Sequence, residues 1–337
     1  MNYGDILTDS FKILWKEKKL WIIGALGTAL FAIGNMFYTG GYLNWYQSMM
    51  RRMMSGPEFP DPETMASEIG TMLYGYVAIM ALWGVFSLIG YVVNLAARGG
   101  GIAEAGRAWQ GEPVDISRGL AAGVRKSPGL FVLDLIWALP GLLFTLIGGG
   151  IGLALLFGFF SSLGQFDDAA ASGRVLGLFG GFFAVLMLFF CLGFLYMLVR
   201  AVFSPLMYQS LVLGEKSLGE AIKEGWRLSR AHLGAMVVFW LLLLAVNMGL
   251  GVVMELVAMP FSFLLIFPMF GAMQNPDALL SSFHWPLFIL FSLAMGAVVW
   301  LVRSLMQSLR LSLYARVYRE LTRPEGEASE TTLSQTV

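Results

Sequence analysis

The chain has 337 residues, of which 57% are apolar and only 13% are charged, and its 22 Lys and Arg residues balance its 22 Asp and Glu residues. Soluble domains carry about 25% charged residues, so this composition excludes an ordinary soluble protein. A single cysteine and two histidines exclude an internal disulfide and a zinc cluster within one chain, and we expect no cofactor, no metal and no nucleic-acid partner.

The N-terminal residues 1–19 form an amphipathic segment. Leu7, Phe11, Leu14 and Trp15 fall on one face of a helix, and the lysines lie elsewhere on it. This pattern predicts a helix on an anionic membrane surface. An ordinary positively charged flank of the first membrane span is the alternative interpretation.

Six uncharged runs follow along the chain. A hydrocarbon core of about 30 Å needs about 20 helical residues, and the runs satisfy this length. We therefore predict an all-α integral membrane protein with six transmembrane helices. The runs are Leu20–Tyr38, Thr71–Ala97, Leu135–Gly164, Val175–Val199, Ala231–Met254 and Ala278–Val302.

The stretch between the first two runs, residues 39–70, is the largest predicted outer loop. Pro57, Pro60 and Pro62 favour extended, irregular chain there. Such a loop can contact a protein partner, or it can be a solvated connector, and the sequence leaves both open.

Two polar stretches between runs carry helix-start signals. Asp115 is a candidate N-cap, and Ser217 with Glu220 has the spacing of a capping box. In the second stretch Leu218, Ile222 and Trp226 recur at helical spacing. We expect both amphipathic helices, with the N-terminal one, to lie on the cytoplasmic membrane surface, where they offer a second possible contact for a protein partner.

The uncharged stretch Leu256–Pro276 is not counted as a seventh span. A seventh span would place the arginines after Arg303 on the outer side, and Pro260 and Pro268 interrupt the stretch. We interpret it as interfacial or re-entrant. The last helix continues past Arg303 into the cytoplasm, and residues 321–337 have the composition of a disordered tail.

The charges are distributed unevenly between the two sides of this predicted topology. With both termini inside, all Lys and Arg residues except Arg51, Arg52 and Arg174 lie on the cytoplasmic side. Lys and Arg in short loops set orientation. The sequence thus predicts a multi-pass protein of the cell (inner, cytoplasmic) membrane, with both termini cytoplasmic and membrane lipids as its surroundings.

Charged landmarks recur at a nearly fixed period. Arg98, Arg200 and Arg303 each close an uncharged run, at spacings of 102 and 103 residues. A fixed period indicates repeated structural units. We predict one transmembrane domain, 1–320, built from three tandem hairpin repeats with boundaries 1–110, 111–213 and 214–320.

Asp134 is the candidate for an intramembrane polar site, because a carboxylate inside a span is costly unless it is paired. Its expected partner is Arg200 or Arg303, and with Arg98 these residues form the candidate site. One hypothesis is a relay or substrate-binding pair. The other is a salt bridge that fixes helix packing.

The N-terminal run Ile6–Trp21, the Gly-Glu turn before a helix ending in Trp226-Arg227, and the six spans resemble multi-pass bacterial membrane proteins related to the membrane domain of glycerophosphodiester phosphodiesterases. In that family the membrane domain can precede a catalytic barrel, whose metal-binding motifs are absent from this sequence. The resemblance implies a membrane domain and no transferred activity. We expect a non-catalytic scaffold or subunit of a membrane assembly, and the alternative is a transporter or lipid-handling protein with a central polar site near Asp134.

Overall fold

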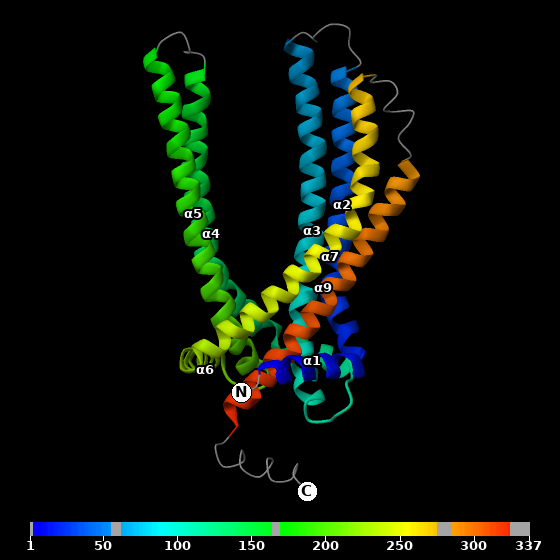
Figure 1. Ribbon diagram of the computed structural model, residues 1–337, viewed down its shortest axis with the longest axis vertical. Coiled ribbons are helices and arrows are strands. Elements are labelled where there is room, and N and C mark those ends of the chain that lie inside the picture. Colours follow the sequence, from blue (N-terminus) through cyan, green and yellow to red (C-terminus); the bar gives the residue numbers. More distant parts are fainter. Residues whose placement is uncertain (1–2, 55–61, 164–168, 275–284, 324–337) are drawn as a thin grey trace. The chain divides into compact units, whose positions relative to one another are not determined.

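The computed structural model of the chain describes residues 3–54, 62–163, 169–274 and 285–323, and all statements below concern these residues. They form eight helices and no strand (Figure 1). The helices are α1 (Tyr3–Lys16), α2 (Lys19–Met54), α3 (Pro62–Ala108), α4 (Ile116–Leu163), α5 (Ala169–Val212), α6 (Leu218–Ala231), α7 (Leu233–Gln274) and α9 (Trp285–Thr322). The all-α prediction is confirmed for this part of the chain.

Five of the helices are long and apolar enough to cross a membrane. Their apolar segments are Lys19–Tyr38, Leu73–Ala108, Ile116–Leu155, Phe179–Val212 and Leu233–Val257. Each overlaps one of the first five predicted runs. The sixth run, Ala278–Val302, begins outside the described residues, and α9 starts at Trp285, so the sixth span stays a prediction.

The helices are longer than the predicted spans. Residues 39–54 belong to α2 and residues 62–70 to α3, so most of the predicted outer loop is helical; residues 55–61 lie outside the described part. Likewise, the expected separate segment at 256–276 is a continuation of α7 as far as Gln274. Prolines are tolerated in membrane helices because neighbouring helices, side chains and ordered waters satisfy the backbone groups that they free. The predicted disordered tail falls almost entirely on residues 324–337, which are not described.

The chain divides into two compact units, and each is considered by itself. Unit 1 comprises Met1–Ser127 and Leu241–Val337, and unit 2 comprises Pro128–Trp240. Helices α4 and α7 each contribute to both.

In unit 1, α2 packs along α3 and α9, and α1 packs on α9 (Figure 1). Most of the buried apolar side chains lie in the C-terminal parts of α3 and α9, in α1 and in the first two turns of α2; examples are Leu95, Ile102, Leu309, Leu313, Leu14 and Ile23. The core of this unit is therefore concentrated where the returning helices end.

In unit 2 the buried side chains are likewise concentrated near helix ends. Its buried side chains come from the first turns of its part of α4, the C-terminal part of α5, helix α6 and the start of α7; examples are Leu130, Leu133, Leu206, Leu211, Leu228 and Phe239. Farther along, α4 and α5 contact each other through aromatic rings, such as Trp137 and Tyr196 at 6.4 Å between centroids. No residue in the most apolar window of α5 is buried. Such a surface is stable only where it is withdrawn from water, which is the condition that a bilayer supplies.

Candidate functional site

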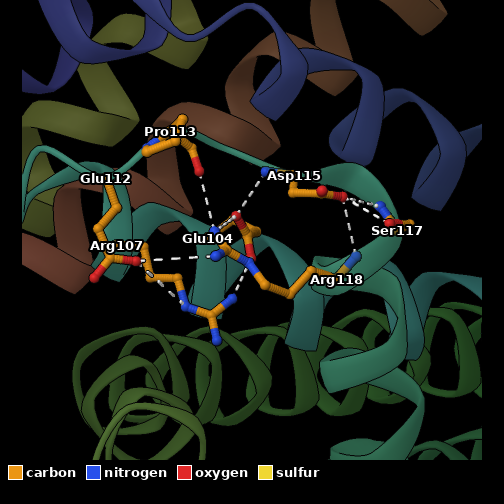
Figure 2. A network of polar contacts seen from close by, with 7 residues as sticks. All are labelled: Glu104, Arg107, Glu112, Pro113, Asp115, Ser117 and Arg118. Carbon is orange, nitrogen blue, oxygen red and sulfur yellow. Dashed lines mark hydrogen bonds and ion pairs between the residues drawn. The ribbon is translucent and has the colours of Figure 1, made fainter.

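The densest polar cluster in unit 1 surrounds the carboxylate of Glu104, which is fully buried near the end of α3 (Figure 2). Arg118 of α4 donates from Nε to Oε1 and from Nη2 to Oε2, both at 3.1 Å. Arg107 donates from Nη1 to Oε1 at 2.6 Å, and the backbone N–H of Asp115 donates to Oε2 at 2.9 Å. These donors fill the four acceptor positions that a carboxylate offers.

Local sequence explains why these groups meet. Gly111 has φ +81°, a conformation that favours glycine, and it turns the chain after α3. Asp115 then starts α4: its Oδ1 accepts the backbone N–H groups of Ser117 at 2.8 Å and Arg118 at 3.2 Å. This confirms the predicted N-cap. The hydrogen bond from the Ser117 hydroxyl, followed by that from the Arg118 backbone N–H, holds the pKa of Asp115 below its ordinary value.

Small residues bring the two helix backbones together beside this cluster. A Cβ at Gly123 of α4 would lie 1.8 Å from the carbonyl oxygen of Ala96 and 2.6 Å from the backbone nitrogen of Gly100, both in α3. A Cβ at Gly100 would in turn lie 2.5 Å from the carbonyl oxygen of Gly119. The helices can approach this closely only because these positions lack side chains.

The end of α9 is fixed to the same part of unit 1. Arg319 donates to the carbonyl of Gly106 at 3.1 Å, and the Trp109 indole donates to the carbonyl of Ser312 at 3.0 Å. The Arg316 guanidinium lies 4.8 Å from the centre of the Trp109 ring, within the range of a cation–π contact. The polar groups at this end of unit 1 therefore join α3, α4 and α9.

Unit 2 contains a comparable joint between α5 and α6. Glu224 of α6 accepts a hydrogen bond from the buried hydroxyl of Ser210 of α5, and Lys216 Nζ lies 2.6 Å from its Oε1. Helix α6 starts as its sequence predicts: the Glu220 carboxylate reaches back to the N–H of Ser217 at 3.1 Å and to its hydroxyl at 2.7 Å. The Ser217 hydroxyl is the main reason why the pKa of Glu220 lies below its ordinary value.

Asp134 is buried in α4, and it accepts a hydrogen bond from the Tyr208 hydroxyl of α5. Arginine partners were predicted for Asp134, and no sequence pattern indicated this tyrosine. Arg200 is half-buried in α5, in the same unit as Asp134. Arg98 in α3 is half-buried and Arg303 in α9 is exposed, and both belong to unit 1.

Glu104 is a site residue that was not among the predicted ones. A signal was present, since Glu104 stands among Ile102, Ala103, Ala105 and Gly106, where a charge needs a partner. Arg107 three residues on is on the same helical face. The second partner, Arg118, depends on the turn between the helices and could not be read from spacing.

Chemically, the saturated Glu104 carboxylate is a structural joint. All of its acceptor positions are occupied by this chain, so it has no free lone pair for proton abstraction or for a ligand. Within the described residues no group of three or more His, Cys, Asp and Glu side chains is placed to hold a metal ion. Comparisons with protein-family models, curated proteins and solved structures give no match to this chain.

Proposed function

We propose that the chain is a non-catalytic multi-pass membrane protein that acts as a scaffold or subunit of a membrane assembly. It crosses the cell membrane six times, with α9 as the sixth span, and both termini are cytoplasmic. The distribution of Lys and Arg in the sequence supports this orientation. The resemblance to the membrane domain of glycerophosphodiester phosphodiesterases remains a prediction, and no phosphodiesterase activity is proposed.

The observation that carries the proposal is the contrast between the two ends of the helices. The polar groups near the ends of α3, α5 and α9 are committed to joints within the chain, whereas the apolar segments are little buried, from none of the α5 window to 28% of the α2 window. Within each unit, helices that are joined firmly near one end and present long apolar segments are suited to organising other helices in a membrane.

Helix α5 is the surface that we assign to a partner helix. There is open space around four glycines of α5. Apart from the adjacent residues and the backbone of the helix itself, no described atom would lie within 4 Å of a Cβ built at Gly177, Gly180, Gly181 or Gly193. Small residues let membrane helices approach closely, and without them apolar helices gain little over contact with lipid. The open space at these glycines and the unburied window together favour another protein's membrane helix on α5.

Burial in the structure supports the proposed three-unit repeat. At spacings of 109 and 102 residues, Ser10, Gly119 and Ala221 are all buried. Four positions later in each segment another buried residue follows, and immediately after it an exposed apolar residue and an exposed cation. These triplets are Leu14-Trp15-Lys16, Gly123-Val124-Arg125 and Gly225-Trp226-Arg227.

Site-specific photocrosslinking in intact membranes tests the scaffold function. A photoreactive residue at Leu188 of α5, which is 57% exposed, should give one discrete protein adduct, and an excess of unlabelled chain should suppress it. Gly180→Leu should abolish the adduct by filling the close-approach position. Gly84→Leu on α3, another position with open space, is the matched control and should leave the adduct unchanged.

Lipid adducts alone from Leu188, with the protein folded and inserted, would contradict the scaffold function. An adduct that consists only of two copies of this chain would assign the α5 surface to self-association and overturn the proposal of a different partner protein.

A transporter or lipid-handling function is the second candidate, favoured by the buried Asp134 carboxylate and its hydrogen bond from Tyr208. If this pair handles a lipid, a lipid species that copurifies with the wild type should be lost from Asp134→Asn, while Gly149→Ala on the same helix retains it. Identical lipid profiles in the folded variants would exclude this candidate.

A further inference from the structure

The amphipathic helices α1 and α6 keep large aromatic side chains exposed. The sequence pattern placed Phe11 and Trp15 on the same apolar face as Leu14. In the structure α1 buries Ile6, Ser10 and Leu14, whereas Phe11 is 41% and Trp15 is 69% exposed. A second apolar surface therefore remains on this helix after it has packed on the protein.

Helix α6 repeats this arrangement. It buries Ala221, Gly225 and Leu228, and a Cβ at Gly225 would lie 2.6 Å from the Met207 backbone of α5. Trp226, which the sequence pattern placed on the apolar face with Leu218 and Ile222, is 45% exposed. In both helices the buried face contacts protein, and the tryptophan next to it along the chain stays exposed.

Each exposed tryptophan touches an aromatic ring on an apolar segment. The Trp15 ring lies 5.4 Å from that of Trp21, in the first turn of α2, at an interplanar angle of 65°. The Trp226 ring lies 4.3 Å from that of Phe203 of α5, at 25°. Both partners lie within the segments long enough to span a membrane. The exposed aromatic surface is thus continuous with the span and lies next to its end.

An exposed cation follows each tryptophan: Lys16 on α1 and Arg227 on α6. An indole ring prefers the headgroup level of a bilayer, and a neighbouring long basic side chain reaches the phosphate layer. Anionic lipids in the cytoplasmic leaflet attract such cations. The combination at the end of a span has the charge and polarity of a lipid headgroup site.

We propose that Trp15-Lys16 and Trp226-Arg227 each bind the headgroup of an anionic phospholipid at the cytoplasmic surface of the membrane. The indole packs at the glycerol level, and the cation binds the phosphodiester. Binding of lipid headgroups requires that the helices be embedded in a membrane, but it does not depend on the scaffold function proposed above.

Lipid selectivity tests the proposal on the full chain. The protein is reconstituted with equal amounts of phosphatidylcholine and phosphatidylglycerol, extracted in mild detergent, and its retained lipids are quantified by mass spectrometry. The double variant Lys16→Gln/Arg227→Gln should lower the ratio of retained phosphatidylglycerol to phosphatidylcholine by about fivefold, the effect of roughly one surface cation at each site. Arg310→Gln, which removes an exposed cation from α9, should leave the ratio unchanged.

An unchanged ratio in the folded double variant, or an equal fall in Arg310→Gln, would overturn the proposal. Depth measurement gives a second readout that does not depend on lipid charge. In a Cys191→Ser background, a bimane label at Trp15→Cys should be quenched by lipids that carry a quencher near the headgroup. A label at Asp5→Cys, which is exposed on the same helix, should instead be quenched by aqueous iodide. Iodide quenching at both positions would place Trp15 in water and refute the assignment.

Discussion

Arg118 binds the carboxylate of Glu104 through two parallel hydrogen bonds of 3.1 Å, and this pair joins the end of α3 to the start of α4 (Figure 2). Glu104 is completely buried, whereas the Arg118 side chain is 41% exposed. The planar guanidinium matches both carboxylate oxygens, which a lysine ammonium cannot do. The bidentate contact therefore fixes the direction of α4 as well as its distance from α3.

Glu104→Gln should destabilise the protein by about 2–3 kcal/mol, because the neutral amide loses charge-assisted hydrogen bonds and places its NH2 group against arginine donors. Thermal unfolding in detergent, followed by circular dichroism, measures the loss. Glu112→Gln is the matched control, since Glu112 lies 4.0 Å from both arginines and is 49% exposed. The control should change stability by less than about 0.5 kcal/mol. Equal effects of the two substitutions would refute the role of Glu104 as the joint.

The Asp115 N-cap predicts a pH dependence. Its pKa is lowered in the folded chain by the Ser117 hydroxyl and the Arg118 backbone N–H. Its charge therefore stabilises the fold above the unfolded pKa of about 3.9, and this contribution is lost as pH falls through the lower folded pKa. Asp115→Asn keeps an N-cap acceptor but has no charge to lose.

The melting temperature of the wild type should exceed that of Asp115→Asn at neutral pH, and the difference should shrink as the pH falls below about 4. Melting curves of both proteins over this pH range provide the measurement, and their subtraction removes the titration of all other carboxylates. A difference that stays constant into the acid range would show that the Asp115 charge does not contribute.

Close packing between α3 and α4 predicts a large effect from one methyl group. In Gly123→Ala the Cβ would meet the Ala96 carbonyl at 1.8 Å, and backbone atoms cannot move aside as a flexible side chain can. We expect destabilisation by about 1–3 kcal/mol or more. Gly149→Ala, in the same helix with no described neighbour within 4 Å, should be neutral or slightly stabilising because alanine favours the helix. Thermal melts of the two variants distinguish a packing effect from a general effect of glycine replacement.

The sequence predicted helix starts well, because these depend on neighbours along the chain. Asp115 and Ser217 both stand where the pattern placed helix N-termini, and α6 occupies Leu218–Ala231. Burial on the amphipathic helices was less predictable. Lipid and protein interior both favour apolar side chains, so periodicity could not reveal that Ser10 packs inward while Trp15 stays exposed.

The contacts of the candidate site were harder to predict because they join distant parts of the chain. A buried carboxylate indicates that a partner exists but does not identify it. The sequence predicts arginine partners for Asp134, whereas its hydrogen bond from Tyr208 depends on how α4 and α5 pack. The pairing of Glu104 with Arg118 could not be predicted, because the two residues are brought together by the turn between α3 and α4 and not by helical spacing. The helices are also longer than the predicted spans, because prolines expected to interrupt regular structure do not do so. Pro62 begins α3, and Pro260 lies inside α7.

The hydrogen bond between Tyr208 and Asp134 predicts an energetic coupling within unit 2. Asp134 lies in α4 and Tyr208 in α5, and both are nearly buried, so the bond joins the two helices next to the packed Leu133 and Leu206. Tyr208→Phe removes only the hydroxyl, and Asp134→Ala removes the acceptor of its hydrogen bond. The double-mutant cycle of the two should give a coupling of about 1 kcal/mol in unfolding experiments, because interhelical hydrogen bonds in membranes have this order of strength. Tyr196→Phe removes a hydroxyl of α5 that has no hydrogen-bond partner among the described residues, so it serves as the control and should couple to Asp134→Ala by less than about 0.3 kcal/mol. A cycle for Tyr208 as weak as that of the control would mean that the hydroxyl does not stabilise the hairpin.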